Sequence, residues 1–171
     1  IQHPGYFVAA CFKISAADAR QMDPQQRLFL ETAIHALNDA NIKPSSLDNT
    51  NTGVFCGAST QDYSQLNIKD QIEFNGYTLT GVAQGGIAGR LSYVLNLKGP
   101  SMAIDTACSS SLAALSVAVT ALQQGQCDLA IVGGVHLSLL PENYIGFTKA
   151  NMLSEKNQCR SFDAEGDGFI H

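Results

Sequence analysis

Residues 101–125 read SMAIDTACSSSLAALSVAVTALQQG, and the pattern changes within this stretch. The opening residues SMAIDT follow Pro100 and are typical of a short buried strand. From Ala107 the apolar residues go nearly all the way round a helical wheel, which predicts a helix that is buried on most faces and ends at Gly125. Cys108 therefore falls where the expected strand ends and the expected helix begins.

A cysteine at the amino end of a helix is a candidate nucleophile. The N–H groups of the first turn and the positive end of the helix dipole stabilise a thiolate, which is the reactive form of the sulfur. The residues beside Cys108 are alanine and serine, so a substrate carbonyl has room to approach, and the Cys108 N–H can help to hold an oxyanion. Spacing alone leaves the alternative open that Cys108 is a small buried residue, as we expect of Cys56 and Cys127.

Strand and helix patterns alternate on both sides of this stretch. The expected elements are a helix over 23–41, a strand over 52–58, a helix over 87–97, a third strand region over 128–140 and a strand that starts at Gly168. Asp23 and Gln26 have the spacing of a capping box at the start of the first helix. This order predicts the α/β class, with a mixed, mostly parallel sheet covered by helices on both faces.

Composition excludes several classes of protein. The chain has 171 residues, 45% hydrophobic and 15% charged, which is ordinary for one globular domain. Its net charge is −5 without a Lys/Arg-rich run, so we expect no nucleic-acid partner. No apolar run reaches the roughly 18 residues of a membrane span, so we expect no membrane partner. The five cysteines are widely spaced, which argues against a disulfide framework and for the reducing cytoplasm.

Other motifs are weak. The glycines of residues 81–89 match neither the dinucleotide-binding nor the P-loop pattern, and close helix packing is the expected role. Residues 163–168 imitate the first half of a calcium loop, but we expect a turn held by bonds from carboxylates to the backbone. No group of residues has convincing zinc spacing, so we predict no metal site.

The four histidines carry no predicted catalytic role. His35 lies between Glu31 and Asp39 on an expected solvated helix face. His136 lies in the third strand region, where a buried, hydrogen-bonded histidine is expected. His3 and His171 lie near the two ends of the chain.

Five segments together resemble one family. The run DTACSSSLAAL at 105–115 is similar to the active-site signature of β-ketoacyl synthases, specifically the ketosynthase domains of modular polyketide synthases. The other four are MDPQQRLFLE at 22–31, AGRLSYVLNLKGPS at 88–101, GGVHLSLLPENYIGFTKANMLS at 133–154 and CRSFDAEGDGFIH at 159–171. The resemblance runs from about Phe12 to the last residue, and one departure is Val82, where relatives usually carry Asn.

This resemblance implies a thiolase-like fold of layered αβαβα type, in which residues 1–171 are the N-terminal half of a ketosynthase. It implies an acyltransferase that performs decarboxylative Claisen condensation. An acyl group passes from an acyl carrier protein to Cys108, and a malonyl-type extender then attacks it. No cofactor is expected to bind directly, since the carrier protein supplies the phosphopantetheine arm. The resemblance also places Phe147 at the border of the acyl cavity beside Cys108 and implies a homodimer.

The family's two catalytic histidines, its lysine and its second oxyanion donor lie on segments beyond the one that corresponds to Phe169. Because the chain starts at Ile1 and ends after an apolar pair, we expect a piece of a longer protein that lacks its C-terminal half and is inert in condensation alone. Two alternatives stay open. One is a non-catalytic half-domain that assembles with a complementary chain or a carrier protein. The other is a coenzyme A-dependent thiolase, which the TACSSS and PENYIGF segments disfavour.

Overall fold

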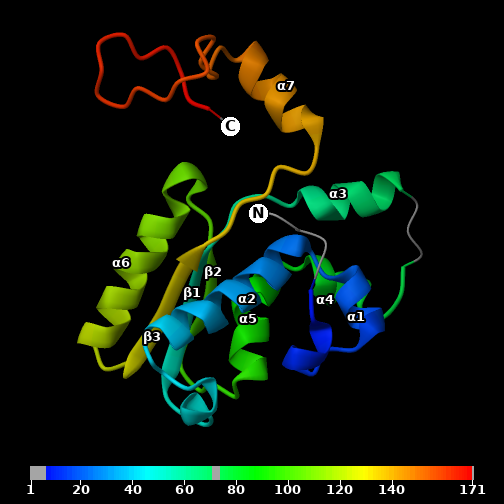
Figure 1. The fold of residues 1–171 in the computed structure, drawn as a ribbon, viewed down its shortest axis with the longest axis vertical. Coiled ribbons are helices and arrows are strands. Elements are labelled where there is room, and N and C mark those ends of the chain that lie inside the picture. The colour runs from blue at the N-terminus through cyan, green and yellow to red at the C-terminus, as the bar shows by residue number, and fades with distance from the viewer. Residues whose placement is uncertain (1–6, 71–73, 171) are drawn as a thin grey trace. The chain divides into compact units, whose positions relative to one another are not determined.

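The structure, a computed structural model, describes residues 7–70 and 74–170. The chain divides into two compact units, residues 1–137 and 138–171. The first unit is built on a parallel sheet in the order β2 (Ser101–Ile104), β1 (Thr52–Gly57), β3 (Leu129–Gly134) (Figure 1). In the register, Cys56 of β1 pairs with Ala103 and Gly133. The predicted α/β class is confirmed, and the described strand pairs are all parallel.

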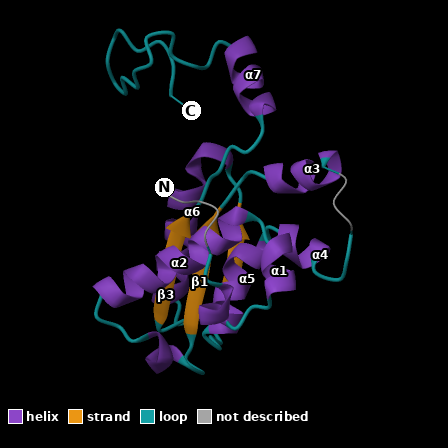
Figure 2. Ribbon diagram, turned by 45° about the vertical axis from the view of Figure 1, so that its right-hand side comes forward, coloured by secondary structure: helices purple, strands orange, loops and turns teal. Residues whose placement is uncertain are grey.

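Helices cover both faces of this sheet, as predicted. Figure 2 shows α2 and α5 on one face and α6 on the other. The helices of the first unit are η1 (Ala9–Phe12), α1 (Ala16–Gln21), α2 (Pro24–Asp39), η2 (Pro44–Leu47), α3 (Asp62–Lys69), α4 (Thr78–Val82), α5 (Gly85–Val94), η3 (Ala107–Ser109) and α6 (Ser110–Gln123). The second unit contains α7 (Pro141–Lys149). Among the described residues, no helix has both the length and the apolar character needed to cross a membrane.

Every residue of the central strand β1 is buried, because helices lie on both of its faces. Val54 and Cys56 belong to the core shared with α2 and α5. Phe55 points to the opposite side, where it packs against the alanines of α6. This arrangement explains why the run TGVFCG is uninterrupted by charge, as expected for a strand covered on both faces.

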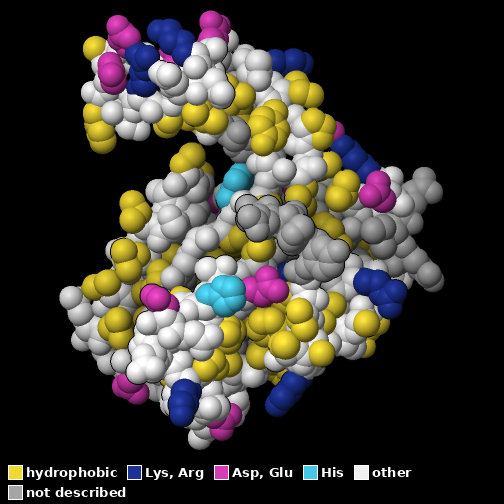
Figure 3. Space-filling view, in the orientation of Figure 1, with side chains coloured by type: hydrophobic (Ala, Val, Ile, Leu, Met, Phe, Trp, Pro, Cys, Tyr) yellow, Lys and Arg dark blue, Asp and Glu magenta, His cyan; other side chains and the backbone are white. Residues whose placement is uncertain are grey.

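The helix α6 differs from the prediction of burial on most faces. Its buried positions are Ser110, Ala114, Ala118 and Ala121, which form one stripe against the sheet. A second apolar stripe on the same helix is exposed. It consists of Leu112, which is 71% exposed, and of Leu115, Val119 and Leu122. Figure 3 shows hydrophobic side chains along α6 at the left of the view. The prediction was wrong because the described part of the chain places neighbours on the sheet side of this helix alone.

The start of α2 also corrects the sequence reading. Asp23 caps the helix as predicted, since its Oδ1 accepts a hydrogen bond from the Gln25 N–H at 2.8 Å. Gln26 does not complete a capping box. Its Nε2 donates instead to the carbonyls of Thr80 and Ala83, both at 3.1 Å. Gln26 therefore joins α2 to the segment that leads into α5, a long-range role that local spacing does not reveal.

Several helix and strand boundaries differ from the predicted ones. The first strand ends at Gly57, β2 ends at Ile104 and α5 covers Gly85–Val94 instead of 87–97. The third strand stops at Gly134 and does not continue into the HLSLL segment. The strand predicted from Gly168 is wrong, because Phe169 makes only an isolated parallel bridge to Leu153. Gly168 itself has φ +149°, a conformation that interrupts a regular strand.

Two glycines let the start of α6 lie directly on the sheet. A Cβ added at Gly57 would stand 2.5 Å from the backbone carbon of Ser110 and the nitrogen of Ser111. At Gly134, an added Cβ would stand 2.8 Å from the Ser111 Cβ. No side chain fits at either position unless α6 moves, so these glycines fix the height of the helix above the strands.

We expect Gly57→Ala to lower the free energy of unfolding by about 1–3 kcal/mol, because the added methyl meets rigid backbone. A matched control is Gly89→Ala in α5, where an added Cβ has no neighbour within 4 Å. Helix propensity predicts that this control stabilises the protein by about 0.4–1 kcal/mol. Urea unfolding curves measure both changes, and equal midpoints for the two variants would contradict the packing argument.

Burial raises the pKa of Asp23 above its ordinary value of 3.8, although its hydrogen bonds to Gln25 oppose the rise. Between pH 3.8 and the raised pKa the folded state binds more protons than the unfolded state, so the free energy of unfolding falls as pH increases through this window. Asn caps a helix about as well as Asp but does not titrate. We therefore expect Asp23→Asn to flatten this part of a stability curve measured by urea unfolding from pH 3.5 upward. An unchanged slope would show that burial does not control the titration.

Candidate active site

The carboxyl ends of the three parallel strands meet at one edge of the sheet, where α/β proteins commonly place their functional residues. The chain leaves β2 at this edge, makes the single turn η3 and enters α6. Cys108 lies in η3 and is exposed. The helix itself begins two residues later than Cys108, at Ser110. The predicted strand-to-helix junction is thus confirmed, with a short turn inserted into it.

Side chains of the turn hold its backbone. Asp105 Oδ1 accepts a hydrogen bond from the Ala107 N–H at 2.9 Å. Ser110 Oγ accepts one from the Thr106 N–H at 3.0 Å and donates to the Ala107 carbonyl at 2.6 Å. Ser109 Oγ donates at 2.9 Å to the Thr106 carbonyl and to its hydroxyl oxygen. The turn is therefore built from the polar residues of the DTACSS run itself.

Sequence reasoning missed these bonds, because it took the serines only as small neighbours of Cys108. Two signals were present. An Asp two residues before the amide that it accepts from is the pattern of an Asx turn. A serine that begins an apolar helix can have its hydroxyl buried against the preceding turn, and Ser110 is 6% exposed.

The helix start supplies the electrostatics of the site. Ser109, the N-cap residue of α6, makes no side-chain cap, so no cap competes for the N–H groups of the first turn. These groups and the helix dipole favour negative charge at the amino end, which is where Cys108 stands. This arrangement suits a thiolate or an oxyanion.

The other cysteines differ from Cys108 in place and exposure. All five cysteines are free. Cys56 lies within β1, and burial raises the pKa of its thiol from 9.0 to about 12. Cys127 is also buried, as predicted, whereas Cys11 and Cys159 are exposed away from any long helix start. Cys108 alone among them combines exposure with the amino end of a long helix.

Two of the four histidines, His35 and His136, lie within the described residues. His35 is exposed on α2, which confirms the predicted solvated face. The expected burial of His136 is wrong, because β3 ends at Gly134 and leaves His136 exposed in the following segment. His3 and His171 lie outside the described residues.

Phe147 lies on α7 in the second unit and is half-buried. Its ring meets that of Phe169 edge-on, with 5.3 Å between centroids and 76° between planes. The same unit contains the calcium-like run, where Asp163 Oδ1 accepts from the Glu165 N–H at 2.9 Å. This carboxylate-to-backbone bond is the turn that the sequence predicts. Within the described residues, no group of three or more His, Cys, Asp and Glu could hold a metal ion.

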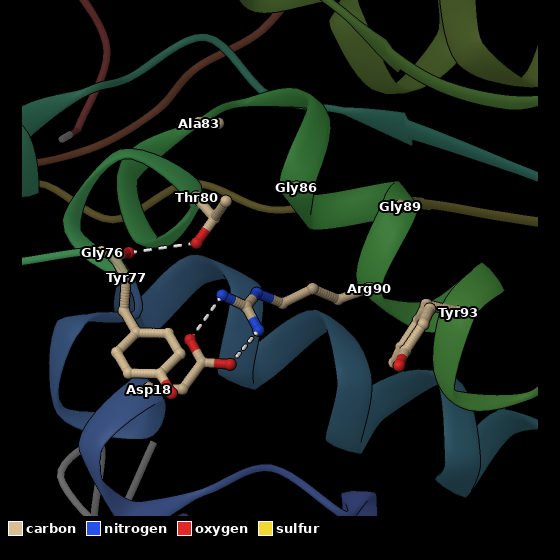
Figure 4. A pocket seen from close by; sticks show the side chains of 9 residues that line it. All are labelled: Asp18, Gly76, Tyr77, Thr80, Ala83, Gly86, Gly89, Arg90 and Tyr93. Atoms are coloured by element: carbon tan, nitrogen blue, oxygen red, sulfur yellow. Dashed lines mark hydrogen bonds and ion pairs between the residues drawn. The ribbon is translucent and has the colours of Figure 1, made fainter.

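A cavity of about 600 Å³ lies elsewhere in the first unit, and Cys108 does not line it. Figure 4 shows Arg90 reaching across it to Asp18, with hydrogen bonds of 2.9 and 2.8 Å to the two carboxylate oxygens. The Arg90 Nε donates in addition to Gln26 at 2.7 Å. The positive charge of Arg90 is thus paired with the Asp18 carboxylate.

Similar proteins point to one family. Residues 1–171 match the family model described as "Beta-ketoacyl synthase, N-terminal domain". A phenolphthiocerol/phthiocerol polyketide synthase of Mycobacterium tuberculosis is 48% identical over 164 residues, which are 96% of this chain and 9% of that protein. Cyclo-acetoacetyl-L-tryptophan synthase of Aspergillus oryzae is 47% identical over 163 residues, 95% of this chain and 4% of that protein.

Solved structures agree. The ketosynthase from module 6 of the bacillaene synthase of Bacillus subtilis has a TM-score of 0.86 and 38% identity, covering 99% of this chain and 29% of that one. An oxazolomycin ketosynthase domain from Streptomyces albus has a TM-score of 0.87 and 37% identity, covering 98% and 30%. These matches confirm the thiolase-like fold class. The chain spans less than a tenth of the curated relatives and less than a third of the solved chains.

Exposure predicts which cysteines react in the folded protein. We expect iodoacetamide at neutral pH to modify Cys108, Cys11 and Cys159, while Cys56 and Cys127 stay unmodified. A thiol with a pKa of about 12 holds almost no thiolate, so Cys56 should resist the reagent even at pH 9. Peptide mapping by mass spectrometry measures the sites, and all five should react in denaturant. Modification of Cys56 at the rate of Cys11 in the native protein would overturn the assignment.

Proposed function

The chain belongs to the β-ketoacyl synthase family, and we propose that it is the nucleophile-bearing part of a polyketide synthase ketosynthase, with Cys108 as the acyl acceptor. One observation carries this proposal. Cys108 is exposed in the turn between the end of β2 and the amino end of α6, where charge on sulfur or on an oxyanion is favoured. The polyketide synthases among its relatives support the substrate class.

The proposed acylation is a transfer between two thioesters. The Cys108 thiolate attacks the carbonyl carbon of an acyl group that is attached to a phosphopantetheine thiol. The carbonyl oxygen then carries negative charge, and the Cys108 N–H donates to it. Collapse of this intermediate breaks the bond to the pantetheine sulfur, which leaves as a thiolate and takes up a proton. The acyl group remains on Cys108 as a new thioester.

In the condensation that follows, the extender loses carbon dioxide and its enolate carbon attacks the Cys108 thioester. A carbon–carbon bond forms, and the Cys108 sulfur leaves. We propose that the histidines and the lysine for this step lie outside residues 1–171, since these residues match the N-terminal domain of the family. The chain alone would then accept an acyl group without turning over extender.

Partners follow from the same proposal. We infer that a cytoplasmic acyl carrier protein delivers the acyl and malonyl-type groups. The exposed apolar stripe of α6, residues 112, 115, 119 and 122, supports assembly with the C-terminal half of the domain. Homodimerisation is supported by β2, an outer strand of the described sheet whose Met102 is 41% exposed. Phe147 remains a prediction for the acyl-binding surface, and its contact with Phe169 would orient its ring.

The exposed stripe of α6 also favours a second candidate, a half-domain that only assembles with another chain and accepts no acyl group. The two functions differ in whether Cys108 forms a thioester. A coenzyme A-dependent thiolase has less support, because one of the relatives described above is a polyketide synthase and both solved structures are ketosynthases.

We expect the purified chain to gain the mass of one acyl group when incubated with an acyl-pantetheine thioester, and peptide mapping should place the group on Cys108. Cys108→Ala should gain none, because the acceptor sulfur is gone. Addition of a malonyl-type thioester should yield no condensation product from this chain alone. Intact-mass spectrometry follows both steps.

The matched control is Cys11→Ser, which removes an exposed cysteine that is not at the start of a long helix and should leave acylation unchanged. Circular dichroism establishes that each sample is folded. A folded chain that takes up no acyl group, or takes it up equally on Cys11 and Cys159, would favour the non-catalytic half-domain.

A further inference from the structure

We propose that Ser110 is a positioning residue for the oxyanion at Cys108, an inference that rests on the acyl transfer proposed above. The Ser110 hydroxyl donates to the Ala107 carbonyl at 2.6 Å. That carbonyl and the Cys108 N–H belong to one peptide unit, which is planar and trans. The two groups therefore point in opposite directions. A bond that holds the carbonyl also fixes the direction of the N–H that receives the oxyanion.

This peptide unit needs such a bond because of the residue that precedes it. Ala107 has φ +54°, in the left-handed region that residues with a Cβ rarely adopt. Without an external hold, the chain would relax toward an ordinary φ and rotate the peptide unit between Ala107 and Cys108. The strain is thus located at the residue that decides where the Cys108 N–H points.

Side-chain bonds hold three successive peptide units of the turn. The N–H of Thr106 donates to Ser110 Oγ at 3.0 Å, and the N–H of Ala107 donates to Asp105 Oδ1 at 2.9 Å. The Ala107 carbonyl accepts from Ser110. Ser110 supplies two of these three bonds with a single hydroxyl, as acceptor on one side of Ala107 and as donor on the other.

Ser110 can act as a fixed point because its own place is determined by packing. It is the first residue of α6 and is 6% exposed. Its backbone lies where a Cβ on Gly57 would be, so it rests directly on β1. The hydroxyl therefore belongs to a rigid element, and it presents the oxyanion donor with little freedom to move.

The neighbouring Ser109 offers a matched control. Its hydroxyl also bonds within the turn, but only to Thr106, at 2.9 Å. Ser109 is exposed and makes no contact that holds the peptide unit between Ala107 and Cys108. Each carbonyl keeps a backbone bond when its serine hydroxyl is removed, Thr106 from the Ser109 N–H and Ala107 from the Ser110 N–H. Only the loss of the Ser110 hydroxyl removes bonds on both sides of Ala107, to the Thr106 N–H and to the Ala107 carbonyl.

The test compares two reactions of Cys108 in the whole chain. Acylation by an acyl-pantetheine thioester passes through an oxyanion, whereas alkylation by iodoacetamide displaces iodide at a saturated carbon and forms none. We expect Ser110→Ala to slow acylation by about 10- to 100-fold, the usual effect of a misplaced catalytic group. Alkylation should change by less than about threefold, because the sulfur and the helix start are still present. Ser109→Ala should change neither rate by more than about threefold.

An equal loss of both rates in Ser110→Ala would overturn the proposal, since it would mean that the hydroxyl acts on the sulfur or on the fold. An unchanged acylation rate would also overturn it. Failure of the proposed function has a different signature, because the unmodified chain would then take up no acyl group at all.

A second pair of variants keeps the test valid should Ser110→Ala fail to fold. Asp105 is exposed, so its replacement disturbs no core. Asp105→Ala removes the acceptor of the Ala107 N–H, whereas Asp105→Asn keeps an acceptor oxygen and removes the same charge. We expect the ratio of acylation to alkylation to fall in Asp105→Ala and to recover in Asp105→Asn. Equal ratios in these two variants would refute the idea that bonds within the turn orient the oxyanion donor.

Discussion

The contact between Gly57 and the start of α6 is the constraint on which the site depends. No Cβ fits between Gly57 of β1 and the backbone of Ser110, so the main chains of the helix and the strand are in close contact there. Ala114, Ala118 and Ala121 continue this close approach along the same stripe, against Phe55. The position of α6 on the sheet also sets where the turn from β2 must enter the helix. Cys108 stands in that turn, and its exposure at the edge of the sheet is a result of packing beneath it.

Much of this arrangement follows from local pattern. An uncharged run such as TGVFCG is typical of a strand covered on both faces, and the apolar stretch after Cys108 is typical of a helix that packs against such a sheet. Two such patterns that meet at one residue place that residue at a sheet edge and a helix end together. The position of Cys108 was therefore accessible from the sequence, because it depends on neighbours within a few positions along the chain.

What escaped prediction depends on distant partners or on the direction of a single bond. Gln26 has the spacing of a cap, yet its amide serves Thr80 and Ala83, which are brought near only by the tertiary fold. His136 was expected to be buried because it lies in the predicted third strand region, but the strand stops at Gly134. The serines of the turn are alike in composition, and only coordinates distinguish the hydroxyl of Ser110 from that of Ser109.

The oxyanion donor proposed here is a main-chain amide, and this has a consequence for engineering. No codon change can delete a backbone N–H other than substitution by proline, and at Cys108 that would remove the nucleophile as well. Substitutions can therefore affect this N–H only through the side chains that hydrogen-bond to its peptide unit. The Ser110 hydroxyl is one such group, because it bonds to the Ala107 carbonyl at the other end of the same peptide unit. Reactivity toward thioesters can then be tuned while the sulfur itself is left as it is.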